Sequence, residues 1–180
     1  IWLGLVGSEM CIRDRDEEVN NGRITDLASV QKGRAVFKKG GTVTAINASK
    51  INDGAAAVVL MSKEKMESLG LKAIGKITGF ADAAQEPLWF TTTPSLAMPK
   101  AAALAGKDVK DFDLYEINEA FSVVALANMK ELDLEHEKVN VMGGAVAMGH
   151  PIGVSGCRIM ITLLSALQNK GGKTGLAGIC

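Results

Sequence analysis

The sequence predicts an α/β fold in which helices pack on a mainly parallel sheet. Short apolar runs that suit strands alternate along the chain with longer stretches whose apolar residues recur at helical spacing. Glycine, asparagine and proline separate these runs, as expected of turns. The chain has 180 residues, of which 47% are hydrophobic, so it can bury a core of domain size.

Charge and cysteine content exclude several classes of protein. Twenty basic and twenty acidic residues cancel, so neither a nucleic-acid footprint nor an anionic membrane partner is indicated. The longest apolar run, Ala55 to Met61, is too short to span a bilayer. Cys11, Cys157 and Cys180 show neither CxxC nor zinc-site spacing. We therefore expect a reducing compartment and a cytoplasmic location, with a mitochondrial location as the alternative.

The first fifteen residues are left out of the predicted fold. Arg13 and Arg15 follow the apolar stretch, whereas a signal peptide carries its basic residues first. We interpret 1–15 as a non-native leader, with a genuine short tail as the alternative.

The middle of the chain predicts three short strands and two helices. Ser62 is expected to cap a helix that turns Met66 and Leu69 inward and that Gly70 ends. A second helix is expected to end at Gly106, with Pro99 tolerable only if it lies in the first turn. The expected strands are Thr42–Ile46, Ala56–Met61, which reads as fully buried, and Ala73–Phe80, and the second helix covers Leu96–Ala105.

The last third of the chain continues the alternation. Asn118 is placed to cap a helix that follows the strand Leu114–Ile117. Glycines at 171 and 172 are expected to end a long helix. The further elements expected here are a strand at Val139–Met142, that long helix at 152–169 and a final strand at Leu176–Ile179.

The segment from Asn140 to Arg158 is the candidate centre for chemistry. His150 lies there within the second of two glycine-containing bends, and Pro151 suits the first turn of the helix that follows. Lys and Ser/Thr do not follow Gly149, so a phosphate-binding loop is not indicated, and the glycine spacing does not match the dinucleotide fingerprint. A core histidine that caps the helix is the simplest alternative.

Several motifs together resemble the thiolase family. They are Asn118-Glu119-Ala120-Phe121, Gly149-His150-Pro151-x-Gly153-x-Ser155-Gly156-x-Arg158, the terminal Gly178-Ile179-Cys180, and a middle segment that runs from Ala45-Ile46-Asn47-Ala48-Ser49 to Asn52-Asp53-Gly54-Ala55-Ala56-Ala57. Their spacing matches the family from Asp16 to Cys180. Ala81-Asp82-Ala83-Ala84-x-Glu86-Pro87 points within it to acetyl-CoA C-acetyltransferases.

The resemblance implies a thiolase-like layered fold, in which two βαβαβαββ halves pack together. Residues 16–72 would be the end of a loop region and the tail of the N-terminal half, and 73–180 a C-terminal domain cut at its last strands. The family cleaves acetoacetyl-CoA with CoA or condenses two acetyl-CoA molecules. Its acyl-accepting cysteine lies in a Cys-x-Ser-Gly context that this sequence lacks. We therefore expect that nucleophile upstream of residue 1, and no catalysis by this chain alone.

The resemblance also implies roles for three residues. Cys180 would be the acid/base that moves a proton at the α-carbon of acetyl-CoA. His150 would donate to the developing oxyanion and activate the nucleophile, and Asn118 would hold a water as the partner donor. The simplest alternatives are an N-cap for Asn118, a buried apolar residue for Cys180 and a solvated first-turn acid for Glu119.

Ligand sites follow from the same resemblance. Ser49 would contact the pantetheine arm of CoA, and Arg23 is a weaker candidate for its phosphates. Some members bind potassium through backbone carbonyls, here those of Ala45, Ile46, Ala48 and Val146. The resemblance implies CoA, acetyl-CoA and acetoacetyl-CoA as substrates, and no permanently bound cofactor is expected. A homodimer or homotetramer is implied for a full-length protein. The alternatives are a longer-chain 3-ketoacyl-CoA thiolase and a non-catalytic protein that binds CoA or a partner.

Overall fold

The computed structural model describes residues 2–5 and 27–180. Most of segment 1–15, which we interpret as a leader, lies outside the described residues, and Cys11 is part of it. Arg23, the candidate contact for the CoA phosphates, also lies outside them. In chain order the elements are β1 Trp2–Leu5, α2 Leu27–Gln31, β2 Val58–Met61, α3 Lys63–Ser68, β3 Gly75–Lys76, η1 Pro87–Thr92, α4 Pro94–Leu104, η2 Val109–Asp111, β4 Leu114–Ile117, α5 Ser122–Leu132, η3 His136–Lys138, α6 Ala145–Met148, α7 Ile152–Lys170 and β5 Gly175–Gly178.

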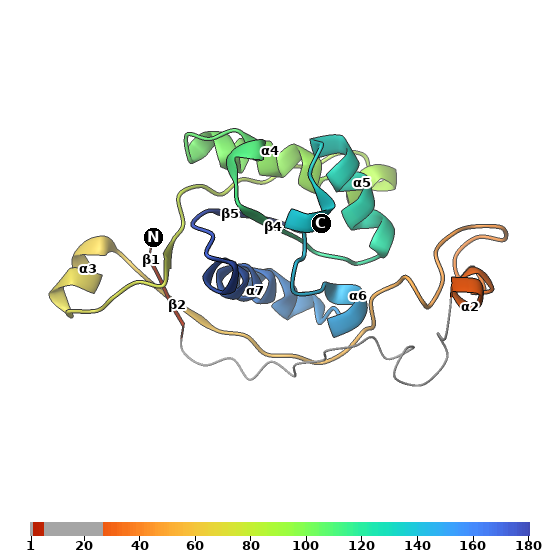
Figure 1. Ribbon diagram of the computed structural model, residues 1–180, viewed down its shortest axis with the longest axis horizontal. Helices are drawn as coiled ribbons and strands as arrows, with labels where there is room; N and C mark the ends of the chain where they lie inside the picture. Colours follow the sequence, from red (N-terminus) through yellow and green to blue (C-terminus); the bar gives the residue numbers. More distant parts are fainter. Residues whose placement is uncertain (1, 6–26) are drawn as a thin grey trace.

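Three layers make up the centre of the molecule (Figure 1). The middle layer is the parallel pair β4–β5, in which Leu114 lies opposite Gly175 and Ile117 opposite Gly178. Helices α4 and α5 pack on one face of this pair, and α7 packs on the other. A parallel pair covered by helices on both faces confirms the layered α/β prediction.

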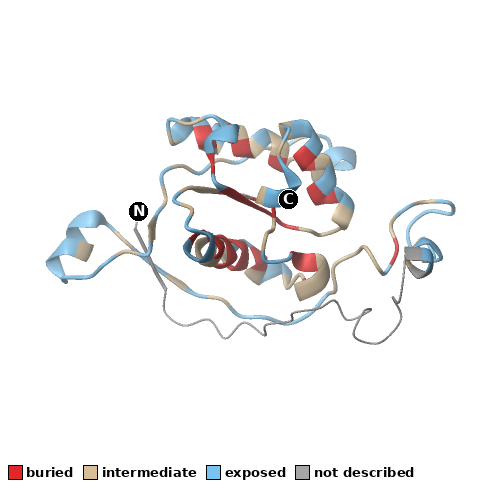
Figure 2. Ribbon diagram, viewed as in Figure 1, coloured by how far each residue is buried: buried red, intermediate tan, exposed pale blue. Residues whose placement is uncertain are grey.

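The core lies between these layers, as the buried residues in Figure 2 show. All four residues of β4 are buried, in agreement with the strand predicted at Leu114–Ile117. The main apolar cluster joins β4 and β5 to α4 and α5, and it includes Met98, Ala102, Tyr115, Ile117 and Met129. Within this core the Tyr115 hydroxyl donates to the carbonyl oxygen of Val109 at 2.7 Å, so its polar end is satisfied.

Helix α7 is the longest element and confirms the helix predicted at 152–169. Its buried side runs from Ser155 to Leu167 and includes Ile159, Leu163 and Ala166. Gly171 ends the helix in the left-handed region with φ +74, where an L-side chain is disfavoured. Pro151 is the residue that precedes the helix rather than part of its first turn.

Helix α4 begins two residues earlier than predicted and keeps Pro99 in its interior. Pro94 occupies the first helical turn, so Pro99 falls in the second turn and removes one hydrogen bond of the helix. Burial of Met98 and Ala102, both 1% exposed, holds this segment against the core despite the missing bond. The expectation that Pro99 is tolerable only in the first turn was therefore wrong.

A second sheet lies beside the layered unit, where Gly75 of β3 is close to Leu164 of α7, and it is antiparallel in the order β2–β1–β3. The described strands therefore form one parallel pair, which lies between the helices, and one antiparallel sheet. Strand β2 lies at the edge of its sheet, and its residues Val59 and Leu60 are 37% and 51% exposed. The prediction of a fully buried strand at Ala56–Met61 was wrong, because β1 is the only strand that pairs with it among the described residues.

Helix α3 follows β2 and starts as predicted. Ser62 is its N-cap and accepts a hydrogen bond from the backbone N–H of Lys65 at 3.2 Å. Gly70, with φ +62, follows its end. Leu69 is 52% exposed, however, so the expected inward face is absent. The strand predicted at Ala73–Phe80 shortens to Gly75–Lys76.

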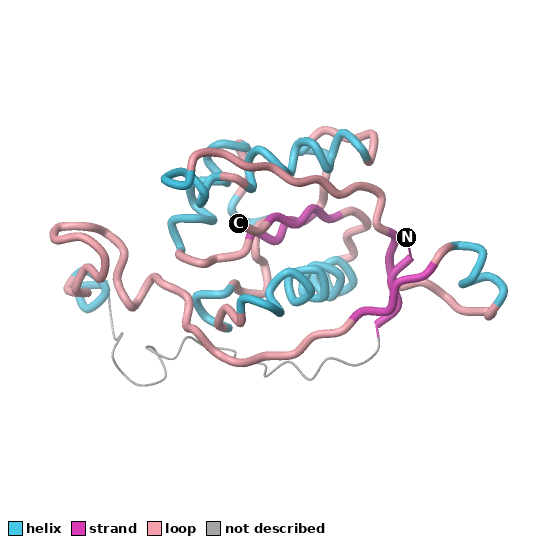
Figure 3. Tube along the Cα trace, turned by 180° about the vertical axis from the view of Figure 1, so that it is seen from behind, coloured by secondary structure: helices cyan, strands magenta, loops and turns pink. Residues whose placement is uncertain are grey.

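Two other predicted strands are reduced to isolated bridges. In the Thr42–Ile46 segment only Thr44 pairs, with Ala35, and in the Val139–Met142 segment only Val139 pairs, with Tyr115. Asn140, next along the chain, has φ +50 and cannot continue a strand. The segment 42–57 instead runs as a loop along the layered unit (Figure 3).

Candidate active site

The carboxyl ends of β4 and β5 form the edge at which the predicted site residues gather. Asn118 follows β4 directly, and its backbone N–H donates to the carbonyl oxygen of Gly178 at 3.0 Å. Cys180 lies two residues beyond Gly178, so both side chains leave the sheet at the same edge. This is the edge at which open parallel sheets place their ligands.

His150 reaches this edge from the bend between α6 and α7. Its backbone N–H donates to the carbonyl oxygen of Lys50 at 2.9 Å. Gly149, which precedes it, has φ +97, and a Cβ there would lie 2.3 Å from the amide nitrogen of Asn52. Both the backbone conformation and the close approach of Asn52 therefore require glycine at this position.

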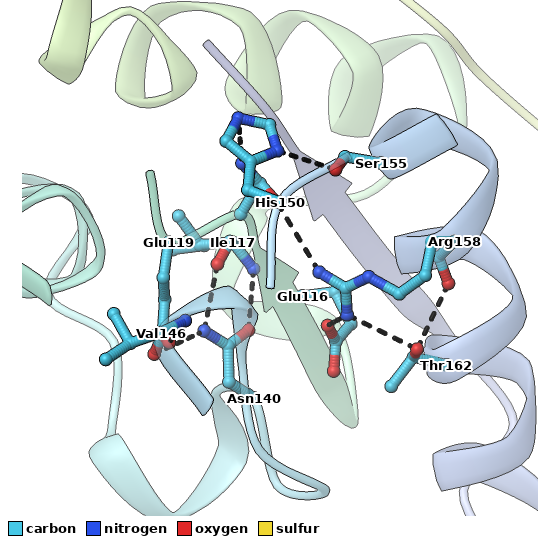
Figure 4. A network of polar contacts seen from close by, with 10 residues as sticks. Glu116, Ile117, Glu119, Asn140, Val146, His150, Ser155, Arg158 and Thr162 are labelled. Atoms are coloured by element: carbon cyan, nitrogen blue, oxygen red, sulfur yellow. Dashed lines mark hydrogen bonds and ion pairs between the residues drawn. The ribbon is translucent and has the colours of Figure 1, made fainter. Parts of the chain in front are cut away.

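Asn118 and His150 are in direct contact. The Asn118 Nδ2 lies 3.3 Å from the His150 Nε2, and the other ring nitrogen, Nδ1, lies 2.6 Å from the Ser155 Oγ. Figure 4 shows the ring with its bond to Ser155. Asn118 is 1% exposed and does not cap α5, whose N-cap is Phe121. The prediction of an N-cap at Asn118 was wrong, because three further residues separate it from the helix.

A buried ion pair between Arg158 and Glu116 lies next to Asn118, and Figure 4 shows its two side chains. Arg158 Nη1 is 3.6 Å from Glu116 Oε2, with the two side chains 6% and 1% exposed. Arg158 Nη2 also donates to the Asn118 Oδ1 at 3.4 Å. Sequence reasoning assigned neither residue a role. The signal that could have found them is a glutamate inside the otherwise uncharged strand Leu114–Ile117.

Burial shifts the acidity of these groups. Loss of solvent raises the pKa of Glu116 to about 8, although the Arg158 charge acts in the opposite direction. Burial also lowers the pKa of Arg158. The pKa of His150 is lowered, first by burial and then by the charge of Arg158. At neutral pH the imidazole is therefore uncharged, which both a proton acceptor and a neutral donor require.

Glu119 supports the loop that carries α6. Its carboxylate accepts hydrogen bonds from the Asn140 Nδ2 and the backbone N–H of Val146, each at 3.2 Å. A Cβ on Gly144 would lie 2.2 Å from this carboxylate, so the glycine makes room for it. Glu119 is partly buried and precedes α5, so it is not the solvated first-turn acid of the simplest alternative.

Residues 47–50 join the two loops of the site. The Ser49 Oγ and the Ser49 backbone N–H both donate to the carbonyl oxygen of Ala120, at 2.9 and 3.0 Å. The backbone N–H of Ser122 donates to the carbonyl oxygen of Asn47 at 2.9 Å. Together with the hydrogen bond from His150 to Lys50, these contacts join the start of α5 and the bend at His150 to the segment 47–50, which we call the strap. Ser49 therefore lies beside the site. Its contact with CoA stays a prediction.

The carbonyls predicted to hold potassium fit that ion incompletely. The carbonyl oxygen of Ala45 accepts a hydrogen bond from the Lys50 ammonium at 3.4 Å. A potassium ion at this oxygen would have to displace a positive charge that is already there. Ala48 forms a bridge with Phe121, and Val146 lies in α6.

The described cysteines and the second histidine lie in contrasting surroundings. Cys180 is exposed by surface area, yet desolvation by neighbouring groups raises the pKa of its thiol. Within the described residues that thiol makes no hydrogen bond to Asn118 or His150, and its meeting with them stays a prediction. Cys157 is partly buried in α7, and His136 is on the surface. None of the helices in the described part of the chain combines the length and apolar character needed to cross a membrane.

The chain is similar to known proteins over most of its length. It is 56% identical to acetyl-CoA acetyltransferase 2 of Arabidopsis thaliana over 175 residues, which cover 97% of this chain and 43% of that protein. Among solved structures, the Acat5 thiolase of Ascaris suum in complex with coenzyme A superposes with a TM-score of 0.83 and 47% identity, covering 92% of this chain and 42% of that one. The human mitochondrial 3-ketoacyl-CoA thiolase in complex with CoA gives 0.84 and 42%, covering 87% and 40%.

Family models match both parts of the sequence. The thiolase C-terminal domain matches residues 71–180, and the thiolase N-terminal domain matches residues 7–64. The chain spans 43% of the length of its Arabidopsis relative. A match over more than half of the chain, joined with high identity and the same fold, establishes the conclusion that the motifs anticipated: this chain belongs to the thiolase family.

Proposed function

We propose that this protein takes part in the condensation of two acetyl-CoA molecules to acetoacetyl-CoA and CoA, and in the reverse thiolysis. The observation that carries the proposal is the contact between Asn118 and His150 at the sheet edge where Cys180 also emerges. The relatives named acetyl-CoA acetyltransferase support the acetyl substrate, and the two thiolases in complex with CoA support CoA as the ligand.

The proposed chemistry divides between three side chains. Cys180 as a thiolate takes the α-proton of the acetyl thioester, and as a thiol it returns that proton during thiolysis. The raised pKa of Cys180 favours the thiol at neutral pH, which is the form that thiolysis uses. His150 and a water on Asn118 stabilise the enolate oxygen, each donor contributing on the order of 10²–10³ in rate. The nucleophile of the Cys-x-Ser-Gly motif has no counterpart in this sequence.

Ser49 is proposed to bind the pantetheine arm, because the strap that contains it borders the site. Binding of potassium by the backbone carbonyls of Ala45, Ile46, Ala48 and Val146 stays a prediction. The Lys50 ammonium, which already donates to the Ala45 carbonyl oxygen, argues against a potassium ion at that oxygen. We also propose a cytoplasmic location, which one relative described as cytosolic supports. A homo-oligomer is proposed from the family resemblance.

The test starts with the gene and ends with an assay. Sequencing on both sides of the codon for Asp16 establishes the reading frame, and the protein that it encodes is assayed for thiolysis of acetoacetyl-CoA. We expect turnover that falls at least about 10²-fold in His150→Ala and Cys180→Ser, whereas Cys157→Ser, in α7, keeps the activity. Faster cleavage of a 3-ketooctanoyl thioester would favour the longer-chain alternative, and CoA binding without turnover would favour a binding protein.

A further inference from the structure

A chain of hydrogen bonds runs from the core to the imidazole, and each of its directions is fixed by chemistry. An arginine side chain has only N–H donors, so the Asn118 atom that faces Arg158 must be the carbonyl oxygen Oδ1. The Asn118 amide therefore turns its NH₂ group toward the His150 Nε2. An amide nitrogen donates and does not accept, so Nε2 has to be the bare, accepting nitrogen of the ring.

The other side of the ring leads to the same assignment. The Ser155 Oγ lies 3.2 Å from the carbonyl oxygen of Pro151, an acceptor, and donates its only proton there. It then accepts the hydrogen bond from His150 Nδ1, 2.6 Å away, so the proton of the neutral ring is on Nδ1. Both neighbours of the ring thus select one tautomer.

Stability alone does not account for the ion pair at the start of this chain. Removing the charged Arg158 guanidinium and the Glu116 carboxyl group from water is unfavourable, and a buried pair of this kind is often no more stabilising than apolar side chains of the same volume. Both carboxylate oxygens of Glu116 and the Nε of Arg158 are buried without a hydrogen bond in the described structure. A pair left this incompletely satisfied is better explained by the group that it holds, the carboxamide of Asn118.

The Arg158 Nη1 that faces Glu116 also donates to the Thr162 Oγ1 at 3.4 Å (Figure 4). We propose that Arg158, held in the core by Glu116 and Thr162, is a positioning residue that fixes the Asn118 carboxamide and through it the Nδ1–H tautomer of His150. The resting imidazole then offers a lone pair at Nε2 and acts first as a proton acceptor. If a thiol S–H transfers its proton to Nε2, the ring becomes an imidazolium, and only then can Nε2 donate to an oxyanion. This catalytic consequence rests on the proposed function, whereas the tautomer does not.

The tautomer can be measured without any turnover. In the ¹⁵N-labelled chain, two-bond ¹H–¹⁵N correlations separate the protonated from the bare ring nitrogen, and the exposed His136 serves as the second ring in the same spectrum. We expect the His150 Nδ1 to be protonated and Nε2 to be bare at neutral pH. A proton on Nε2 in the unmodified chain would overturn the proposal.

Two variants test the cause. In Glu116→Gln/Arg158→Met the pair is removed together, so no lone charge stays buried, and we expect a folded chain in which Nε2–H becomes populated. A His150 ring that keeps its proton on Nδ1 in this folded variant would overturn the proposal. Ile161→Val is the matched control, because Ile161 is 3% exposed on α7 and outside the chain of bonds.

The second variant, Asn118→Asp, keeps the shape of the side chain but replaces the donor by a carboxylate. Residue 118 contacts the His150 ring directly, so the ring tautomer can be measured in this variant even if the paired variant does not fold. We expect Nε2 to acquire a proton, since an acceptor now faces it. A bare Nε2 in this variant would contradict the proposed coupling.

Catalytic readout separates this proposal from the proposed function. In an active protein, the paired variant is expected to lower kcat by about 10-fold or more, on the scale of supporting residues that orient a functional histidine, and to leave KM for CoA unchanged. An unchanged kcat in an active protein would contradict the positioning role. Absence of activity in the unmodified protein that the established reading frame encodes would instead count against the proposed function and leave the tautomer result standing.

Discussion

Strands β2 and β4 have the same length and opposite surroundings. β2 reads Val-Val-Leu-Met and is the more apolar, yet Leu60 is 51% exposed. β4 reads Leu-Tyr-Glu-Ile, includes a carboxylate, and is buried at every residue. Figure 2 shows the same contrast between the layered unit and the segment that contains β2. Burial therefore follows from what covers a strand, since helices pack on both faces of the β4–β5 pair while β2 is an edge strand.

The largest expected effect comes from removing one side chain from each strand. Ile117→Ala in β4 should lower the free energy of unfolding by about 2–5 kcal/mol, because it opens a cavity in the core. The matched change Leu60→Ala in β2 should lower it by about 0.5 kcal/mol or less. Urea unfolding of the two variants measures the difference. Equal losses would mean that β2 is as well covered as β4, and the contrast would fail.

The second prediction uses two glutamates with opposite pKa shifts. Burial raises the pKa of Glu116 from 4.5 to about 8, whereas a backbone hydrogen bond and Ser62 lower that of the exposed Glu64. Folded Glu116 retains its proton to higher pH than Glu116 in the unfolded chain. The contribution of this proton to the free energy of unfolding is therefore complete below about pH 4.5 and is lost as the pH rises through 8. The loss amounts to at most about 1.4 kcal/mol for each pH unit.

Thermal unfolding between pH 5 and 8 measures this loss. The unmodified chain should lose stability with rising pH relative to Glu116→Gln, which cannot ionise. Glu64→Gln is the control in the other region and should not reproduce that relative change. Parallel pH profiles for the unmodified chain and Glu116→Gln would show that the buried carboxyl is not protonated in this range.

The smallest expected effects come from two caps. Asp108 accepts from the backbone N–H of Lys110 at 3.1 Å and starts η2, which packs on α4 in the layered unit. Asp108→Ala should lower the free energy of unfolding of the layered unit, measured in the main unfolding transition, by about 1 kcal/mol. Ser62→Ala removes the cap of α3, which has no buried residue, so it should reduce hydrogen-exchange protection in 63–68 and leave the main transition in place. A shift of the main transition in Ser62→Ala would show that α3 unfolds together with the core.

Local chemistry in the sequence predicted the elements of the layered unit well. Leu114–Ile117 and the long helix follow from runs of the right period, and Gly106, Gly70 and Gly171 end helices because each has a positive φ. Predictions failed where neighbours decide the outcome. Ala73–Phe80 has strand-like residues but forms only a two-residue strand, and Asn118 has the chemistry of a cap but lies outside the helix.

By itself, the sequence determined the family, the layered α/β class and the candidates Asn118, His150 and Cys180, because motif spacing and apolar period are properties of the chain order. Only the tertiary structure added Glu116 and Arg158 to the site and decided which side chains meet. Glu116, Asn118, His150 and Arg158 come from the end of β4, the α6–α7 bend and the α7 interior. The directions of their hydrogen bonds, and hence the ring nitrogen that carries the proton, depend on distances that no sequence pattern encodes.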